Sequence, residues 1–425
     1  MIKVQRRGGY RRAHAWNKAR VQLGGILLFA TALPTIILAM FYVHFMDAEA
    51  SQMAALGTLV AGCASVYLVR NISLYPGIRG AFFVFPSVLV CFALTFSFFL
   101  FFRVDYSRAL LIGGSIGTLI WLYIVQIMIE RRSVLNVGIV PFGNVTMLVE
   151  EPMLELHWLS EPVRTRHYDV LVADFRADLT DEWEAFLADC ALAGMPVLHV
   201  KQLHESLTGR VEIEHLSENS FGSLVPFIAY LRLRRGFDFI AAIAAAILLL
   251  PLFVVVAIAI KLDSPGPVLF RQVRIGYRGV PFHVAKFRTM VANRDEADER
   301  AGAMTRDNDK RVTRIGRFLR RTRIDELPQV LNILKGEMSW IGPRPEAEVL
   351  SRWYETELPF YRYRHIVPPG ITGWAQVTQG HVADLDAVMS KLHYDFYYIK
   401  NFSPWLDALI IAKTVQTVVT GFGSR

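Results

Sequence analysis

Long apolar stretches without a charged side chain constrain this 425-residue chain more than any other feature. A helix needs about 20 apolar residues to cross the roughly 30 Å hydrocarbon core of a bilayer. Four such stretches lie in the first third of the chain, over residues 21–46, 51–69, 80–102 and 109–129, and a fifth covers residues 239–260. With 53% hydrophobic residues and a mean hydropathy of +0.32, the composition indicates a membrane protein rather than a soluble one.

The charges between these stretches predict one orientation. Residues 1–20 form a basic leader with seven Lys or Arg residues and no acid, and arginines also follow the second and fourth stretches. Residues 47–50, after the first stretch, are acidic instead. Because positively charged loops stay on the cytoplasmic side, we predict a four-helix transmembrane region at residues 21–132, with the leader and everything after residue 130 in the cytoplasm. The first apolar stretch is too long for a cleaved signal peptide.

The fifth stretch has two readings, a fifth spanning helix or a helix that enters the membrane and returns. A spanning helix tolerates a proline when neighbouring groups satisfy the freed backbone. However, Pro251 lies near the centre of this stretch, where it clashes with the carbonyl of Ile247 and favours a kink. Cations flank both ends, with Arg232, Arg234 and Arg235 before it and Lys261, Arg271, Arg274 and Arg278 after it. Both flanks therefore favour the cytoplasm, and we predict a re-entrant helix over residues 237–262 with its break at Pro251.

A small α/β domain is expected between these membrane segments, at residues 134–222. Residues 134–140, 168–173 and 196–200 have the composition of buried parallel strands, and residues 180–193 that of an intervening helix. The glycines after the first strand do not form the GxGxxG pattern of a dinucleotide site. The domain is therefore expected to act as a scaffold or to form a dimer, with nucleotide binding as the alternative.

Two adjacent carboxylates, Asp325 and Glu326, stand among cations in the last third of the chain. Seven Lys or Arg residues occupy the fifteen positions before Asp325. A helix cap at Asp325, with Gly336 ending the helix, would explain the acids, and a basic surface facing a membrane would explain some of the cations. Together, however, carboxylates and guanidinium groups suit chemistry on a phosphoryl group better than they suit a core.

Further segments extend this pattern along the chain. Lys286 and Arg288 stand among apolar residues, and Arg344 lies in a Gly-Pro-Arg-Pro sequence at residues 342–345. Residues 368–377 read as a glycine-rich turn that enters a strand-like run. Such a turn can bring backbone N–H groups close to phosphate oxygens.

In combination, these segments resemble one family, the bacterial sugar transferases, which are large monotopic polyprenyl-phosphate phosphoglycosyl transferases. The resemblance covers roughly residues 233–420 and depends on a specific, ordered set of motifs. Those motifs are the apolar helix with its proline, residues 264–272, 286–290, 325–329, 342–345 and 369–377, and the aromatic segment 394–398. The resemblance implies a membrane α plus α/β protein of the bacterial inner membrane: four N-terminal transmembrane helices, a small Rossmann-like cytoplasmic domain, and an α/β catalytic domain at residues 227–425 with the re-entrant helix.

The resemblance also implies a reaction and a set of site residues. The reaction is transfer of a sugar phosphate from a UDP-sugar to undecaprenyl phosphate with release of UMP, as the first membrane step of exopolysaccharide, capsule or O-antigen assembly. Asp325 would be the nucleophile that forms a covalent phosphosugar intermediate and a ligand of Mg²⁺, and Glu326 would assist it. Contacts to phosphates and other substrate groups are implied for Lys286, Arg288, Arg320, Arg344, Thr372, Gln376 and Asp395.

Two other classes of protein compete with this interpretation. A non-catalytic membrane scaffold of polysaccharide assembly would keep the apolar stretches but would not need the ordered acidic and basic motifs. A membrane nucleotide-sugar dehydratase would need a dinucleotide fingerprint and usually a Tyr-x-x-x-Lys pair, and no tyrosine here has a lysine four residues on. The net charge of +8 fits anionic lipids and phosphate-bearing substrates, whereas nucleic acid is not an expected partner beside four spans. A homodimer is compatible with the extra domain.

Overall fold

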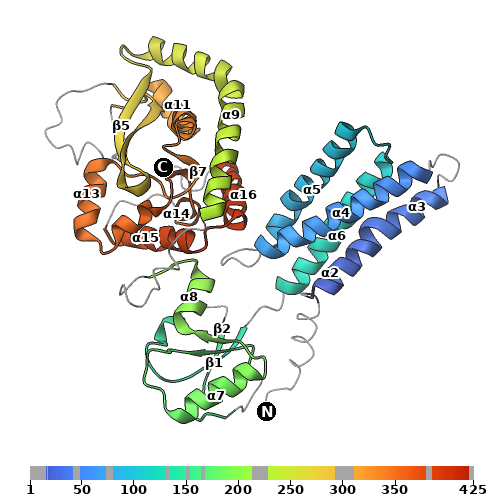
Figure 1. The fold of residues 1–425 in the computed structure, drawn as a ribbon. Coiled ribbons are helices and arrows are strands. Elements are labelled where there is room, and N and C mark those ends of the chain that lie inside the picture. Colours follow the sequence, from blue (N-terminus) through green and yellow to red (C-terminus); the bar gives the residue numbers. More distant parts are fainter. Residues whose placement is uncertain are drawn as a thin grey trace. The chain divides into compact units, whose positions relative to one another are not determined.

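A computed structural model describes residues 16, 18–41, 48–72, 80–130, 135–149, 154–163, 168–212, 228–291, 311–379 and 385–420. The chain divides into two compact units, residues 1–209 and 210–425 (Figure 1). Most of the predicted basic leader lies outside the described residues.

Helices coincide with the four N-terminal apolar stretches. They are α2 (Ala19–Gly25), the π-helical η1 (Ile26–Ala32), α3 (Leu33–Phe41), α4 (Ala48–Ile72), α5 (Gly80–Phe102) and α6 (Arg108–Glu130). Small residues let these helices approach closely, since a Cβ added at Gly117 of α6 would lie 2.0 Å from the carbonyl oxygen of Phe29 in η1. Each of the four stretches is long and apolar enough to cross a membrane, and many apolar side chains such as Leu94 and Phe101 point outward, as expected in lipid.

The first unit also contains the predicted α/β domain. Its strands β1 (Leu135–Ile139), β2 (Leu154–Trp158), β3 (Val170–Ala173) and β4 (Val197–His199) pair in parallel in the order β2-β1-β3-β4. The described helices are η3 (Thr146–Leu148), α7 (Asp181–Leu192) and α8 (Val200–Thr208). The three predicted strands and the predicted helix are confirmed, whereas β2 was not predicted.

A carboxylate fills the place where open parallel sheets usually bind phosphates. Strand order changes direction between β1 and β3, and ligands of such sheets bind beyond the carboxyl ends of the strands at this point. Here Asp174, 4% exposed, accepts N–H hydrogen bonds from Asn144 (3.0 Å) and Arg176 (3.1 Å) and lies 3.2 Å from Nε2 of His199. The N–H groups of Asn144 and Arg176 are thus bonded to the Asp174 side chain.

The second unit combines two small sheets with a layer of helices. Strands β5 (Leu269–Ile275) and β6 (Pro281–Phe287) form an antiparallel hairpin around η5 (Tyr277–Gly279), and β7 (Ser339–Ile341) pairs in parallel with β8 (Gly370–Thr372). The described helices are α9 (Ile228–Asp263), α11 (Arg314–Arg321), η6 (Ile324–Gln329), α12 (Val330–Leu334), α13 (Glu348–Glu357), η7 (Tyr361–Ile366), α14 (Trp374–Thr378), α15 (Leu385–Lys400) and α16 (Pro404–Thr420). The sequence predicts a strand-like run up to residue 377. This prediction is wrong beyond Thr372, where β8 ends, because α14 begins at Trp374.

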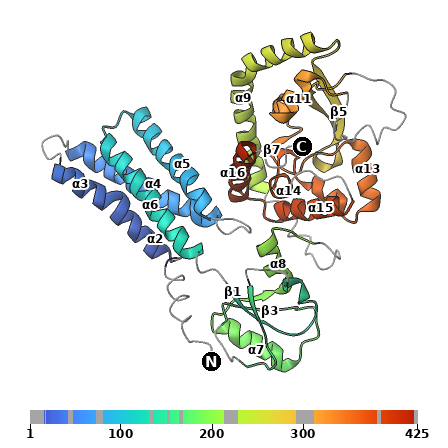
Figure 2. The same ribbon diagram turned by 180° about the vertical axis from the view of Figure 1, so that it is seen from behind.

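Helix α9 is longer than the predicted segment 237–262, and it bends into two limbs (Figures 1 and 2). The first limb packs through Ala242 with α12 and the β5–β6 hairpin, and the second packs through Val256 and Ile260 with α11 and Phe287. Pro251 lies inside the helix, and proline is a known cause of such bends. Apolar side chains on the outer surface, including Ile247 and Leu248, remain exposed.

Both ends of α9 are fastened to the same unit. Near its start, Arg234 is buried and donates to Tyr398 (2.7 Å) and to Ser339 (2.5 Å), with Asp407 at 3.3 Å. Beyond its other end, Arg288 donates to the carbonyl of Ser264 (2.6 Å). These hydrogen bonds fix the two limbs of the helix relative to β7 and to β6.

Candidate active site

The β5–β6 hairpin and η6 bring Lys286 to the two adjacent carboxylates. Asn332 of α12, which is 1% exposed, accepts from the N–H of Ala285 (2.9 Å) and donates to the carbonyl of His283 (2.7 Å). These two bonds fix β6 beside the η6–α12 segment. As a result Lys286, the next residue on β6, reaches Glu326 from 40 residues away in the sequence.

Glu326 holds two cations together. Its Oε1 lies 2.8 Å from Nζ of Lys286 and 2.6 Å from Nη2 of Arg344, and its Oε2 accepts from Nη1 of Arg344 at 3.3 Å. Burial alone would raise the pKa of Glu326, but Arg344 and Lys286 outweigh it and hold that pKa well below its ordinary value. Burial also lowers the pKa of Lys286 to about 8, against the opposing effect of Glu326. Glu326 is thus an ionised, fully engaged carboxylate.

Asp325 stands in contrast to its neighbour. It is 9% exposed, and within the described ranges no hydrogen bond or ion pair joins its carboxylate to another residue. Burial and the charge of Glu326 raise the pKa of Asp325, and the nearby Lys286, Arg320 and Arg344 oppose that rise. The interpretation of Asp325 as a helix cap is wrong, because it lies within η6 and neither η6 nor α12 has a side-chain cap. Among the described residues, no partner therefore occupies its oxygen atoms.

Glycines determine where Arg344 lies. A Cβ at Gly342, whose φ is +156°, would lie 2.4 Å from the carbonyl oxygen of Pro368, and one at Gly370 would lie 2.1 Å from the nitrogen of Gly342. The N–H groups of these glycines donate to Thr372 (2.8 Å) and to Pro343 (3.0 Å). Glycine is therefore required for close contact between two chain segments. Within the predicted glycine-rich turn at residues 368–377, the N–H of Gly370 is therefore bonded to Pro343 and does not face a phosphate site.

The backbone after Arg344 is held by further buried charges. Arg364 donates to the carbonyl of Arg344 (2.9 Å) and to Asp395 (2.9 Å), and Asp395 is only 2% exposed. On the other side, Arg274 donates to the carbonyl of Pro345. Asp395 therefore acts on the site through Arg364 and is not open to a substrate in this structure.

The remaining predicted residues lie in different surroundings. On α11, Arg320 donates from Nε to Oγ1 of Thr289 (2.9 Å). Arg320 is also close enough to Asp325 for its positive charge to oppose the rise in the pKa of that carboxyl. Arg288 is buried and bound to the turn after α9. Thr372 contacts Thr414 of α16 (2.8 Å). Gln376 donates to the carbonyl of Ile371 (3.0 Å), and its buried Oε1 has no hydrogen-bond partner among the described residues. The structure thus gathers Lys286, Arg320, Asp325, Glu326 and Arg344. Arg288, Thr372, Gln376 and Asp395 instead form these hydrogen bonds with residues outside this cluster.

Several residues that organise the site were missed in the sequence, namely Arg234, Arg274, Asn332, Glu346 and Arg364. Glu346 pairs with Lys391. Burial alone would raise the pKa of Glu346, but Lys391 and Arg364 outweigh burial and lower that pKa. Glu346 follows the Gly-Pro-Arg-Pro motif directly, which was an available signal. The three arginines carry no local pattern that distinguishes them from surface cations. Asn332 likewise has no local pattern that distinguishes it from a polar residue on a helix surface.

A magnesium ion fits these residues only with help from a substrate. In the described part of the chain, no group of three His, Cys, Asp or Glu side chains could hold a metal by itself. Asp325 offers one carboxylate that no described residue pairs with, whereas both oxygens of Glu326 are engaged. Mg²⁺ commonly takes one or two carboxylates together with substrate phosphates, and this donor set is compatible with that habit.

The fold and the site together define an enzyme that is attached to a membrane and acts on anionic groups. Residues 229–421 match the bacterial sugar transferase family. Over 371 residues, covering 87% of each chain, the sequence is 44% identical to a UDP-N-acetylgalactosamine-undecaprenyl-phosphate N-acetylgalactosaminephosphotransferase of Aeromonas hydrophila. UDP-glucose:undecaprenyl-phosphate glucose-1-phosphate transferases are similar over shorter lengths: that of Caulobacter vibrioides is 41% identical over 47% of this chain and 74% of its own, and that of Escherichia coli K12 is 43% identical over 43% of this chain and 39% of its own.

The chain belongs to the bacterial sugar transferase family. It is an enzyme of the phosphoglycosyl transferase class, and the rival interpretations as a scaffold or a dehydratase are set aside.

Proposed function

We propose that this protein transfers a sugar phosphate from a UDP-sugar to undecaprenyl phosphate and releases UMP. The observation that carries the proposal is the contrast between the two carboxylates: Asp325 is buried and unpaired within the described residues, and Glu326 binds the cations beside it. The names of the similar transferases support both substrates. A relative named as an exopolysaccharide production protein supports a role in the first membrane step of exopolysaccharide, capsule or O-antigen assembly.

The proposed reaction has two steps because both substrates are anions that repel each other. In the first step a carboxylate oxygen of Asp325 attacks the phosphorus that bears the sugar, the bond to the UMP oxygen breaks, and UMP leaves with that electron pair. In the second step a phosphate oxygen of undecaprenyl phosphate attacks the same phosphorus and Asp325 leaves as a carboxylate. The product is a sugar linked to undecaprenyl diphosphate, and the enzyme is restored.

The cations around Asp325 would stabilise the charge that develops on the phosphoryl oxygens. Arg344 and Lys286 are held in place by Glu326, and Arg320 comes from α11. Glu326 would therefore orient the cations and remain ionised, since its pKa is held well below the ordinary value by Arg344 and Lys286 despite burial. The raised pKa of Asp325, caused by burial and by Glu326, makes its carboxylate a stronger nucleophile than a solvated one.

A magnesium ion is part of the proposal. Asp325 and the phosphates of the UDP-sugar would hold it, and bound Mg²⁺ would supply further neutralisation of the diphosphate. Glu326 would support this arrangement through Lys286 and Arg344.

We further propose that α9 is re-entrant and that the second unit lies on the cytoplasmic side of the bacterial inner membrane. A straight helix of 36 residues would be about 54 Å long, and a spanning helix would place its two ends on opposite sides. Instead, the start of α9 is bound to β7 through Arg234, and the turn after α9 is bound to β6 through Arg288. Asn332 connects β6 to α12, and only four residues separate α12 from β7. One compact unit thus holds both ends, which supports a helix that turns back.

The function is tested with the full chain in nanodiscs. UMP release is measured for a panel of UDP-sugars with undecaprenyl phosphate and Mg²⁺, starting with UDP-N-acetylgalactosamine because the relative that matches over most of the chain is named for it. Without acceptor, one UDP-sugar should release UMP in near-stoichiometric amount and leave a phosphosugar on Asp325, found by mass spectrometry of peptides. Asp325→Asn should lose both signals, and Asp386→Asn on the exposed start of α15 should keep them. An adduct on another residue, or turnover by Asp325→Asn, would remove the mechanism.

A further inference from the structure

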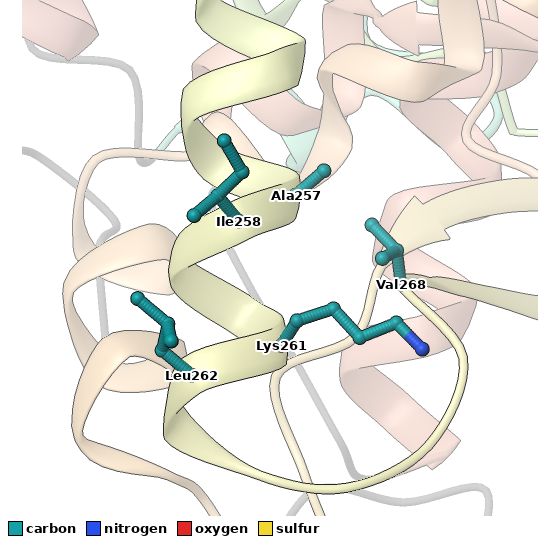
Figure 3. Close-up of a pocket in the computed structure, with 5 residues that line it drawn as sticks. All are labelled: Ala257, Ile258, Lys261, Leu262 and Val268. Carbon is teal, nitrogen blue, oxygen red and sulfur yellow. The ribbon is translucent and has the colours of Figure 1, made fainter.

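A shallow groove lies along the second limb of α9 (Figure 3). Its volume is about 300 Å³. The residues that line it are Ala257, Ile258, Lys261, Leu262 and Val268. Four of these five side chains are hydrocarbon, so water gains little from filling the groove and an apolar chain gains much.

Lys261 is the one charge in the lining. Figure 3 shows its side chain extending from the helix toward Val268, so that the ammonium nitrogen ends beside that residue. The alkyl part of the lysine adds to the apolar wall while its head stays at the rim. An apolar groove with one cation matches a ligand that has a hydrocarbon tail and an anionic head.

The outer side of the groove continues into the apolar surface of α9. Ile258 is 55% exposed and Leu262 is 84% exposed. Because α9 is apolar enough to lie in a membrane, a lipid can enter the groove sideways from the bilayer without crossing water.

The inner side of the groove leads to the strand that carries Lys286. The carbonyl of Val268 accepts from the backbone N–H of Arg288 (2.9 Å), which directly follows β6. Lys286, two residues earlier and on β6, binds Glu326. On the core side of the same limb, Ile260 packs in a cluster with Ile324, the neighbour of Asp325. The groove therefore borders the elements that position the two carboxylates.

We propose that this groove binds the acceptor, with the isoprenoid units next to the phosphate lying along Ala257 and Val268 and with Lys261 pairing with the phosphate. This inference rests on the proposed function and adds the place where the acceptor binds. The occupant is a single-chain isoprenoid phosphate rather than a bulk phospholipid. The groove is at the lower end of the roughly 300–1,000 Å³ range of ligand sites, which suits one narrow chain better than two acyl chains.

The test compares KM for the two substrates in full-length protein in nanodiscs of fixed composition. Ala257→Leu narrows the groove and should raise KM for undecaprenyl phosphate about tenfold, the factor expected when about two methylene groups lose their burial. Lys261→Gln should raise the same KM about threefold to fivefold, as expected for a partly exposed ion pair. In both variants KM for the UDP-sugar and UMP release without acceptor should keep their wild-type values. Matched controls are Leu248→Phe on the exposed surface of α9 and Lys335→Gln after α12.

A second arm varies the acceptor. A short all-cis prenyl phosphate has fewer isoprene units beyond the groove but the same cis units next to the phosphate, so Ala257→Leu should raise its KM by a similar factor. Unchanged acceptor KM in both variants would overturn the proposal, and so would an effect that follows the phosphatidylglycerol content of the nanodisc instead of the acceptor concentration, since that pattern indicates a bulk lipid site. Wild-type protein that releases no UMP with any UDP-sugar would refute the proposed function itself, before any groove variant is examined.

Discussion

Replacing each of the two adjacent carboxylates by its amide should separate a chemical role from a structural one. Glu326→Gln removes the charge between Lys286 at 2.8 Å and Arg344 at 2.6 Å, where all three side chains are largely buried. Removing one partner of a buried ion pair costs about 3–5 kcal/mol. Since 1 kcal/mol shifts Tm by roughly 2–4 °C for a unit of this size, Tm should fall by roughly 6–20 °C.

Asp325→Asn should behave in the opposite way. The Asp325 carboxylate has no ion pair among the described residues to lose, and burial already opposes its charge. We therefore expect Tm to stay within about 2 °C of wild type, whereas turnover should fall by about a thousandfold or more, as for other nucleophiles removed from an active site.

Both quantities are measured on full-length protein in one detergent, with tryptophan fluorescence on heating for Tm and UMP release for activity. Asp386→Asn, on α15, is the control for an acid-to-amide change at an exposed position. The reasoning fails if Asp325→Asn lowers Tm as much as Glu326→Gln does, or if Glu326→Gln is as stable as wild type.

Other predictions concern the surrounding charges and the topology. Asp395→Asn should lower Tm by a similar roughly 6–20 °C, and the double variant Asp395→Leu with Arg364→Met should recover Tm but not turnover, because Arg364 also holds the carbonyl of Arg344; recovery of both would contradict a positioning role. Burial lowers the pKa of Lys286 to about 8, so the folded protein loses this proton through about pH 8, whereas the unfolded chain keeps it to about pH 10.4. Stability should therefore rise with pH between these values, while turnover falls. In Lys286→Arg, the fall in turnover should move to higher pH. A pH–rate profile that does not move would show that Lys286 does not cause the fall in turnover. Cysteines introduced at Gly236 and Pro267, both exposed near the ends of α9, should show equal reactivity toward an impermeant reagent in spheroplasts; labelling of only the second would refute a re-entrant helix.

The amino-acid sequence alone shows which segments are apolar, where the helices over the four N-terminal apolar stretches and α7 lie, and which three segments form strands β1, β3 and β4. These are local properties, because long uncharged runs and buried parallel strands carry their signal in consecutive residues. The signal weakens for short elements. Strand β2 was missed, and the residues after Thr372 were read as a strand although they form α14.

Sequence patterns also identify the charged residues of the site, but the role of each residue depends on the tertiary structure. Asp325 and Glu326 are neighbours with similar side chains, and they differ because Lys286 and Arg344 reach one and not the other. Asp395 reads as a substrate contact in the sequence and is a buried partner of Arg364 in the fold.

The physical reason is that pairing and desolvation depend on distances between residues that are far apart in the chain. Lys286 is 40 residues from Glu326, and Arg364 is 31 residues from Asp395. A charged side chain behaves differently when it is solvated, when it is in a buried ion pair, and when it is buried without a partner. The folded chain determines which of these environments each side chain has.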